Sequence, residues 1–293
     1  MKIAIIYISY LPYGPSCLEN FLQSYIANKP LINHSLHIVI KGWSDNKNDT
    51  QLLLCEEILS NYEIEHTKHY SNDEYDISVY FSMAKKIRSD YFVFFNTNTK
   101  ILHKKWLQYF INNITKPGVG VVAATGAWGD ATLNKRMFNL LKKCTTLKVS
   151  FKEIKQLIFY YYNYYPTLKP HIRTNAFMIE SKILSKLVFH KVSPSFLRIF
   201  MRGKSTNRAI QQAVCFEHGR KSMCVQIESM NLHTLVVGAD GRGYKQPEWC
   251  SSKIFLSGNQ ENLLIADNQT EKYATGKDSL RKYLRFCAWH KYN

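Results

Sequence analysis

The stretch YFVFFNTNTKIL, residues 91–102, carries the clearest structural signal in the sequence. Its first five residues, Tyr91 to Phe95, are aromatic or branched, with no charged position among them. Such a run predicts a strand that is buried on both faces, as the inner strands of parallel sheets are. The run stops at Asn96, and in open α/β sheets ligands bind outside the carboxyl ends of the strands. Asn96 and Asn98 are therefore predicted to contact a ligand.

Strand and helix patterns alternate on the N-terminal side of this stretch. Strands are predicted at 3–9, 36–42 and 63–70, and helices at 17–27, 51–61 and 75–87. The last of these helices leads the chain directly into the strand at 91–95. Alternation of this kind predicts βαβ units, right-handed crossovers and a parallel sheet. The predicted class is α/β.

The length of 293 residues suits one large domain, or one domain with an appended segment. We expect a domain over 1–245, with a helical insertion at about 131–168, and a C-terminal extension over 246–293. The extension ends in a basic amphipathic helix. Packing of this helix on the same domain is favoured over a role as a membrane anchor.

The formal net charge of +17 predicts an anionic partner. Nucleic acid, a phospholipid surface and a phosphorylated substrate are the three candidates, and a lysine-rich composition without a particular partner is the alternative. The basic residues are spread along the chain rather than gathered in one tail, which disfavours nucleic acid. We therefore expect no nucleic-acid partner, and favour a phosphorylated substrate or an anionic membrane surface.

The cysteines and the first residues indicate a compartment. The seven cysteines are scattered, odd in number and without a Cys-x-x-Cys pair, so they predict neither a zinc site nor a disulfide framework. Free thiols in a reducing cytoplasm account for them. Residues 1–14 fit a buried strand better than a signal peptide, and no apolar stretch reaches the roughly 20 residues of a membrane helix. We expect a cytoplasmic protein that also visits the inner face of the membrane.

Four stretches, taken in order, resemble the glycosyltransferases of the GT-A fold, and especially their large inverting family of bacterial cell-surface polysaccharide enzymes. IVIKGWSDN (38–46) resembles a strand followed by the family's nucleotide loop. The segment 75–99 resembles the helix and apolar strand that run into an Asp-x-Asp motif. IRTNAFMIESKIL (172–184) is similar to the acceptor-side segment, and FEHGRKSMCVQIESMNLHTLVV (216–237) to the segment with a Glu-Asp pair. The likeness spans about residues 1–240.

The resemblance implies a GT-A (Rossmann-like) fold, with a mixed, mostly parallel sheet flanked by helices. It also implies transfer of a sugar, with inversion, from a nucleotide-sugar donor to a hydroxyl group of a glycan or lipid-linked acceptor. The corresponding setting is the synthesis of cell-surface polysaccharide or lipopolysaccharide. The donor sugar, the nucleotide and the acceptor are not specified by these motifs.

The chain departs from the family at its metal motif. Asn96 and Asn98 stand where the family has the two aspartates that hold a divalent metal. An amide oxygen is neutral and a poor substitute for a carboxylate around a hard cation, so we expect no metal cofactor. The negative charge of the departing nucleoside diphosphate must then be stabilised by cationic side chains. Lys41, Arg173 and Arg220 are the candidates.

Glu217 and His218 match the family's acidic pair, with His218 in the place of the aspartate. Inverting transfer requires a general base for the attacking hydroxyl, and either a carboxylate or an imidazole can serve. We favour Glu217, with His218 as its hydrogen-bond partner, and expect the pair to open a helix. In the alternative, Glu217 only favours the positive end of that helix and His218 faces solvent.

The remaining candidates are binding residues. Asp45 and Asp76 are predicted on the nucleotide side, although Asp76 is equally well explained as a helix N-cap. Arg173 suits a diphosphate and Asn175 a sugar hydroxyl, with structural capping as the alternative for both. Asp240, in a glycine-rich turn, is predicted to approach the acceptor.

Two other functions compete with sugar transfer. A nucleotidyltransferase shares the nucleotide crevice at the strand ends, but SYLPYGPS (9–16) lacks the glycine-rich signature that normally follows its first strand. A non-catalytic protein that only binds sugars or polyanions is favoured by the loss of both metal carboxylates.

Overall fold

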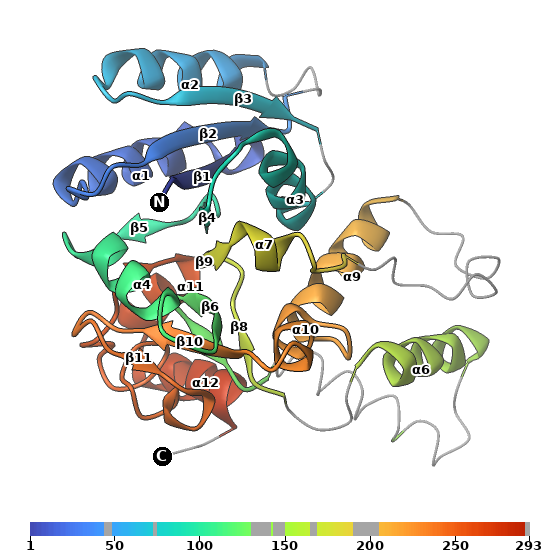
Figure 1. The fold of residues 1–293 in the computed structure, drawn as a ribbon. Coiled ribbons are helices and arrows are strands. Elements are labelled where there is room, and N and C mark those ends of the chain that lie inside the picture. The colour runs from blue at the N-terminus through green and yellow to red at the C-terminus, as the bar shows by residue number, and fades with distance from the viewer. Residues whose placement is uncertain are drawn as a thin grey trace.

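The computed structural model describes residues 1–43, 49–72, 75–129, 142, 150–164, 169–189 and 205–290. Within these residues the centre of the molecule is an eight-stranded sheet with the order β11-β10-β6-β9-β4-β1-β2-β3 (Figure 1). The strands are β1 (Ile3–Tyr10), β2 (Ser35–Lys41), β3 (Thr67–Ser71), β4 (Tyr91–Phe95), β6 (Val119–Ala123), β9 (Ala176–Glu180), β10 (His233–Val237) and β11 (Gly243–Tyr244).

The sheet is mixed and mostly parallel. β3, β2, β1 and β4 pair in parallel, and so do β6 and β10. β9 runs antiparallel to both of its neighbours, β4 and β6, and β11 runs antiparallel to β10. The predicted α/β class with a mixed, mostly parallel sheet is confirmed. Two small antiparallel pairs complete the strands: β5 (Lys100–Ile101) with β12 (Ile265–Ala266), and β7 (Gly126–Ala127) with β8 (His171–Ile172).

Helices flank this sheet. Their bounds are α1 (Pro15–Ala27), α2 (Asp49–Asn61), α3 (Asp76–Lys86), α4 (Trp106–Ile114), α6 (Phe151–Asn163), α7 (Ser181–Leu184), α9 (Ser205–His218), α10 (Met223–Ser229), α11 (Asn268–Ala274) and α12 (Asp278–Trp289), with short 3₁₀ turns η1 (Leu11–Tyr13) and η3 (Gln246–Glu248). The predicted helices and strands of the first hundred residues are confirmed, with ends that differ by a few residues. In the described part of the chain, no helix is long and apolar enough to cross a membrane.

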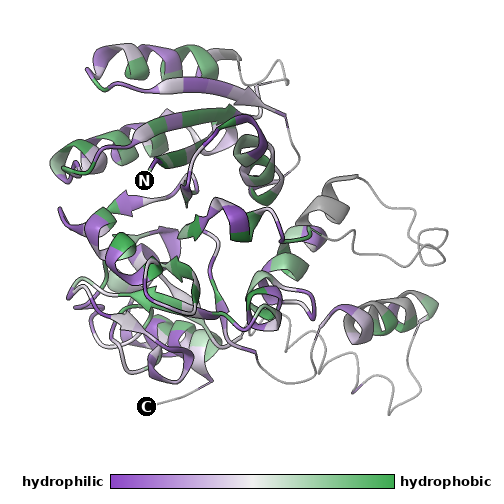
Figure 2. Cartoon of the chain, in the orientation of Figure 1, coloured by the Kyte–Doolittle hydropathy of each residue, from purple (hydrophilic) through white to green (hydrophobic). Residues whose placement is uncertain are grey.

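β1 and β4 are inner strands that bury both faces, as their sequences predict. Alternate residues of β4 enter different clusters: Phe92 and Phe94 pack on one face of the sheet, and Val93 and Phe95 on the other. All four side chains are at most 1% exposed. Figure 2 shows hydrophobic colour in the central strands and along parts of the flanking helices. A parallel sheet covered on both sides requires this arrangement.

The C-terminal residues share the core of the preceding chain. Trp249 and Trp289, each 1% exposed, belong to the same cluster as Phe94 and Phe216. In addition, β12 pairs with β5, which directly follows the stretch 91–99. In Figure 1 the red helices α11 and α12 lie near β10 and β11, at the end of the sheet opposite to β3. The predicted insertion at 131–168 falls mostly outside the described residues, apart from α6.

Candidate functional site

The carboxyl edge of the sheet gathers most of the predicted residues. β1, β2 and β4 are parallel, so Lys41 at the end of β2 and Asn96 after β4 lie along one edge. β9 is antiparallel to β4, with Ala176 opposite Phe95, so Asn175 precedes β9 at this same edge. Ligands of open α/β sheets bind at such an edge, where the order of the strands reverses.

Asn96, Thr97, Asn98 and Thr99 form a closed turn, which we call the asparagine turn. The Asn96 Oδ1 atom accepts hydrogen bonds from the Asn98 backbone N–H and from the Thr99 hydroxyl, each over 3.2 Å. The Tyr7 hydroxyl donates to the Thr97 carbonyl over 2.9 Å. The turn is therefore held by its own side chains and by β1.

The asparagine turn does not fit the divalent metal that the family motif would hold. Both bonds to Asn96 Oδ1 come from within the turn, and the Asn98 Oδ1 atom accepts from the Cys17 thiol over 3.8 Å. These oxygens carry no charge to offset the desolvation of Mg²⁺ or Mn²⁺.

Asn175 lies against the asparagine turn. Its backbone carbonyl accepts from the Asn96 N–H over 2.9 Å, and its side-chain oxygen accepts from the Thr125 hydroxyl over 3.0 Å. The side chain belongs to a residue that is only 4% exposed, and the Nδ2 atom has no hydrogen-bond partner. A buried donor without a partner costs about 1–3 kcal/mol. An acceptor atom of a ligand that reached Asn175 Nδ2 would remove this cost.

Lys41 and Asp76, both predicted on the nucleotide side, are brought together. The Lys41 Nζ atom lies 3.1 Å from Asp76 Oδ1, and the lysine side chain is 8% exposed. The ammonium also lies over the rings of Tyr10 and Tyr75, at 5.1 and 5.7 Å from their centroids. Tyr75, not Asp76, is the N-cap of α3, so the capping alternative for Asp76 is wrong; its carboxylate occupies the first turn instead. Asp45 lies outside the described residues.

Arg173 forms an ion pair with Asp267, a contact that the sequence did not predict. Its guanidinium forms a hydrogen-bonded ion pair with Asp267 and stacks over the Phe255 ring, 4.5 Å from the centroid. The Asp267 side chain is fully buried and caps α11 by accepting from the Gln269 and Thr270 N–H groups. Arg173 thus ties the strand β8 to the C-terminal segment. Binding of a diphosphate by Arg173 stays a prediction.

Glu217 and His218 end a helix rather than open one, so that part of the prediction is wrong. α9 closes at His218, where Gly219 donates its N–H to the Cys215 carbonyl over 2.8 Å. A Cβ atom at Gly219 would lie 2.5 Å from that same carbonyl oxygen, so only glycine fits there. The next helix, α10, starts separately, with Ser222 as its N-cap. Glycine after a helix and serine before one are ordinary stop and start signals.

The end of α9 meets the segment before β9 in a small polar cluster. The Thr174 backbone N–H donates to Glu217 Oε1 over 3.1 Å, and Glu217 Oε2 lies 3.7 Å from His218 Nε2. The His218 ring packs edge-to-face on His171, with centroids 3.9 Å apart. Glu217 and His218 are 22% and 17% exposed, which makes them accessible from solvent. We call His171, Thr174, Glu217 and His218 the histidine–glutamate corner.

His171 and Thr174 are the members of this corner that the sequence did not predict, and His171 is the one with an ionisable side chain. His171 begins β8, in the stretch of chain that precedes β9. It is 2% exposed, and burial, with the neighbouring His218 as a lesser cause, lowers its pKa to about 3. The residue is therefore neutral, and its Nδ1–H donates to the Lys169 carbonyl over 3.2 Å. The available signal was the position of His171 at the head of HIRTN, two residues before Arg173 and four before Asn175.

Arg220 and Asp240 have evident structural roles. The Arg220 Nε–H donates to the carbonyls of Tyr161 and Tyr164, at the end of α6, over 3.1 and 2.9 Å. Asp240 is exposed in the turn between β10 and β11, where it accepts from the Arg242 N–H and the Tyr244 hydroxyl. Their predicted contacts with the diphosphate and the acceptor stay predictions.

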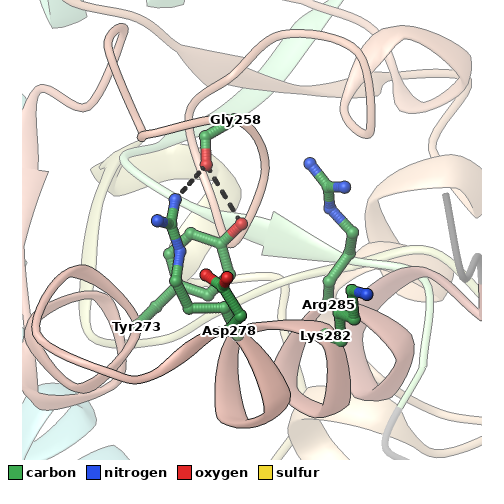
Figure 3. Close-up of a pocket in the computed structure, with 6 residues that line it drawn as sticks. Gly258, Tyr273, Asp278, Lys282 and Arg285 are labelled. Carbon is green, nitrogen blue, oxygen red and sulfur yellow. Dashed lines mark hydrogen bonds between the residues drawn. The ribbon is translucent and has the colours of Figure 1, made fainter.

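A basic pocket lies apart from these residues, on the C-terminal helices (Figure 3). It has a volume of about 180 Å³ and is lined by Gly258, Tyr273, Asp278, Arg281, Lys282 and Arg285. Arg281 donates to the Gly258 carbonyl over 2.8 Å and stacks on Tyr273. Figure 3 shows Lys282 and Arg285 across the pocket from Tyr273. Three cationic side chains and one carboxylate line the pocket, and this excess of positive charge favours the binding of an anion.

No protein-family model and no curated protein sequence matches the chain. Among solved structures, mouse xyloside xylosyltransferase 1 is similar, with 9% identity, 81% of this chain and 85% of that chain covered, and a TM-score of 0.42. A mannosyltransferase from Pyrobaculum calidifontis, solved with GDP-Man and Mn²⁺, has 10% identity, coverage of 80% and 54%, and a TM-score of 0.37. A CMP:2-keto-3-deoxy-manno-octonic acid synthetase with CTP has 9% identity, coverage of 84% and 94%, and a TM-score of 0.42.

Two of these three structures are sugar transferases by their descriptions. Identities of 9–10% and scores below 0.5 describe a likeness of fold and carry nothing about substrate or mechanism.

Proposed function

We propose that this chain is a glycosyltransferase that moves a sugar from a nucleotide-sugar donor to an acceptor hydroxyl. The observation that carries the proposal is the link between the end of β4 and Glu217. Asn175 accepts from Asn96 in the asparagine turn, and the preceding residue, Thr174, holds the Glu217 carboxylate. A proton acceptor is thereby fixed beside the edge where open α/β sheets bind nucleotides.

In the proposed reaction, the acceptor oxygen attacks the anomeric carbon while the bond to the nucleoside diphosphate oxygen breaks. The hydroxyl proton passes to Glu217 Oε2, since Oε1 is held by the Thr174 N–H. His218, beside Oε2, orients the carboxylate. Direct displacement by this route inverts the anomeric carbon. A positioned base of this kind contributes about 10²–10⁴-fold to a rate.

The charge that develops on the leaving diphosphate is assigned to cationic side chains. Lys41 lies at the end of β2 and Arg173 directly precedes Thr174 in the corner, so both lie near the crevice. Each is already paired with a carboxylate, Asp76 or Asp267. These pairs hold the cations in fixed places, and pre-placed charge stabilises a transition state without reorganisation. Transfer is proposed to need no divalent metal.

The experiment is a thermal-shift screen with UDP, GDP, dTDP and CMP and their sugars, followed by turnover assays in EDTA. A bound nucleotide stabilises the fold by about 2.7 kcal/mol at a hundredfold excess over its dissociation constant. We expect one nucleotide class to raise the midpoint, and its sugar to be transferred. Stabilisation by a nucleotide-sugar without any turnover would favour the non-catalytic protein. Release of pyrophosphate from a nucleoside triphosphate and a sugar would favour the nucleotidyltransferase.

We also propose that the acceptor is a lipid-linked glycan met at the inner face of an anionic membrane. The net charge of +17 and the basic pocket on α12 support this. Each basic residue near such a surface contributes about 1 kcal/mol, and salt screens the attraction. Flotation should recover the protein with anionic vesicles at low salt. Equal recovery with neutral vesicles, or none with either, would refute the membrane proposal alone.

A further inference from the structure

Three metal-ligating side chains meet in the histidine–glutamate corner. His171, Glu217 and His218 each offer one ligand atom, and these atoms all lie within 4.8 Å of one another. His171 comes from β8, and Glu217 and His218 come from the last turn of α9. The asparagine turn contributes none of these atoms, so this group is distinct from the family's metal motif.

The types of donor select a class of ion. Two imidazoles and one carboxylate suit Zn²⁺ and similar borderline transition ions, whereas Mg²⁺ and Ca²⁺ prefer oxygen ligands. Three protein ligands also leave a fourth position for water, as in many zinc sites. The chemistry of the corner therefore favours zinc over the magnesium or manganese of an Asp-x-Asp motif.

Contacts around the ligands orient them in the way that metal sites require. A backbone carbonyl can only accept, so the bond to Lys169 places the proton of His171 on Nδ1 and its lone pair on Nε2. Glu217 Oε1 is held by the Thr174 N–H, while Oε2 faces His218. Outer hydrogen bonds of this kind fix the tautomer and direction of the ligands.

We propose that His171, Glu217 and His218 form a zinc-class metal site. Tetrahedral Zn²⁺, with bonds of roughly 2.0–2.1 Å, separates its ligand atoms by about 3.3 Å. The three atoms must therefore close from up to 4.8 Å, and the partly exposed Glu217 and His218 at the end of α9 are the ones that move. One consequence rests on the proposed function: an ion bound to Glu217 takes the electron pair that would accept the proton, so zinc inhibits transfer.

The test is titration of the EDTA-treated and desalted full chain with ZnCl₂ by calorimetry, and with CoCl₂ by visible absorption. We expect one ion per chain at the corner and an intense, tetrahedral cobalt spectrum. Glu217→Gln and His218→Gln should each weaken binding by more than about tenfold, since even outer-shell changes cost 10–100-fold. His171→Gln should weaken zinc binding to the same extent if the variant folds. If it does not fold, the Glu217→Gln and His218→Gln variants alone test the proposal.

His69→Gln is the matched control. Among the described residues, His69 on β3 and His37 on β2 form a second close pair of histidines, with 3.0 Å between His37 Nδ1 and His69 Nε2. Zinc binding that survives Glu217→Gln and His218→Gln but disappears in His69→Gln would overturn the proposal. So would the absence of any binding by the unaltered chain. One-to-one zinc binding in a protein that turns over no nucleotide-sugar would leave the metal site standing and remove the proposed function.

Discussion

The asparagine turn and the histidine–glutamate corner lie at the same edge of the sheet, yet they use their polar groups in opposite ways. In the turn, the Asn96 oxygen accepts two bonds from its own neighbours, and Thr97 and Thr99 are each 2% exposed. In the corner, the ionisable side chains of Glu217 and His218 remain 22% and 17% exposed. By sequence, the turn has amides at both positions where the motif that it resembles has carboxylates, whereas the corner keeps one carboxylate, Glu217, beside His218.

The largest expected effect comes from removing the charge of the corner. Glu217→Gln should lower turnover by about 10²–10⁴-fold and leave nucleotide binding intact, because the amide cannot accept the proton. His218→Ala should cost less, through orientation of the carboxylate alone. Steady-state rates and nucleotide titration by calorimetry measure both.

Glu180→Gln is the control for that comparison, since Glu180 ends β9 at the opposite edge of the sheet. A larger loss in His218→Ala than in Glu217→Gln would make His218 the base. Full rates in both variants would remove the corner from the chemistry, and Asp240 would be the next candidate.

The second prediction concerns how the corner is anchored. Asp267→Ala leaves the Arg173 guanidinium partly buried without its carboxylate and removes the cap of α11. Breaking a buried pair by removing one partner costs about 3–5 kcal/mol. Urea unfolding should show a loss of that order. Glu56→Gln, in the exposed pair with Lys68, should cost at most about 1 kcal/mol. Equal losses in the two variants would contradict the anchoring role.

The third prediction is a pH dependence of stability at the corner. Because burial lowers the pKa of His171 to about 3, the unfolded chain binds this proton first as the pH falls. The contribution of neutral, buried His171 to the free energy of unfolding is fully present above about pH 6.5, the ordinary pKa of histidine. This contribution is lost as the pH falls towards 3. Urea midpoints from pH 7 to pH 4 should fall less steeply in His171→Gln. His37, whose pKa burial lowers to about 4, contributes similarly, so some slope remains in the variant. An unchanged slope would show that His171 takes up its proton without opening the corner.

The smallest expected effect is at the asparagine turn. EDTA should change the rate of transfer little, because Asn96 and Asn98 offer no carboxylate to a metal. Asn96→Asp combined with Asn98→Asp should in turn create binding of Mn²⁺, measurable by calorimetry. Loss of nearly all activity in EDTA, restored by Mn²⁺, would contradict this. Another acid would then supply the ligand: Asp130, outside the described residues, or Asp267, which is buried in its ion pair.

Much of the fold could be predicted because its signals are local. The apolar run at 91–95 specifies an inner strand whatever lies beside it, and the alternation of strand and helix patterns specifies a largely parallel sheet. The antiparallel insertion of β9 between β4 and β6 was not predicted in detail. Its direction depends on where the chain returns to the sheet, and no pattern within residues 176–180 encodes that.

The candidate site also has features that local sequence predicts and contacts that it does not. The ends of the strands, the asparagines at positions 96 and 98 and the adjacency of Glu217 and His218 can be read from the sequence alone. The contacts between distant residues came from the folded structure: the Arg173 side chain meets Asp267, 94 residues away, and the Thr174 backbone N–H meets Glu217, 43 residues away. The folded structure also placed Glu217 and His218 at the end of α9 rather than at a helix start. Secondary structure follows from the spacing of apolar residues along a few turns or strands, whereas contacts between distant segments follow from how those elements pack around a common core.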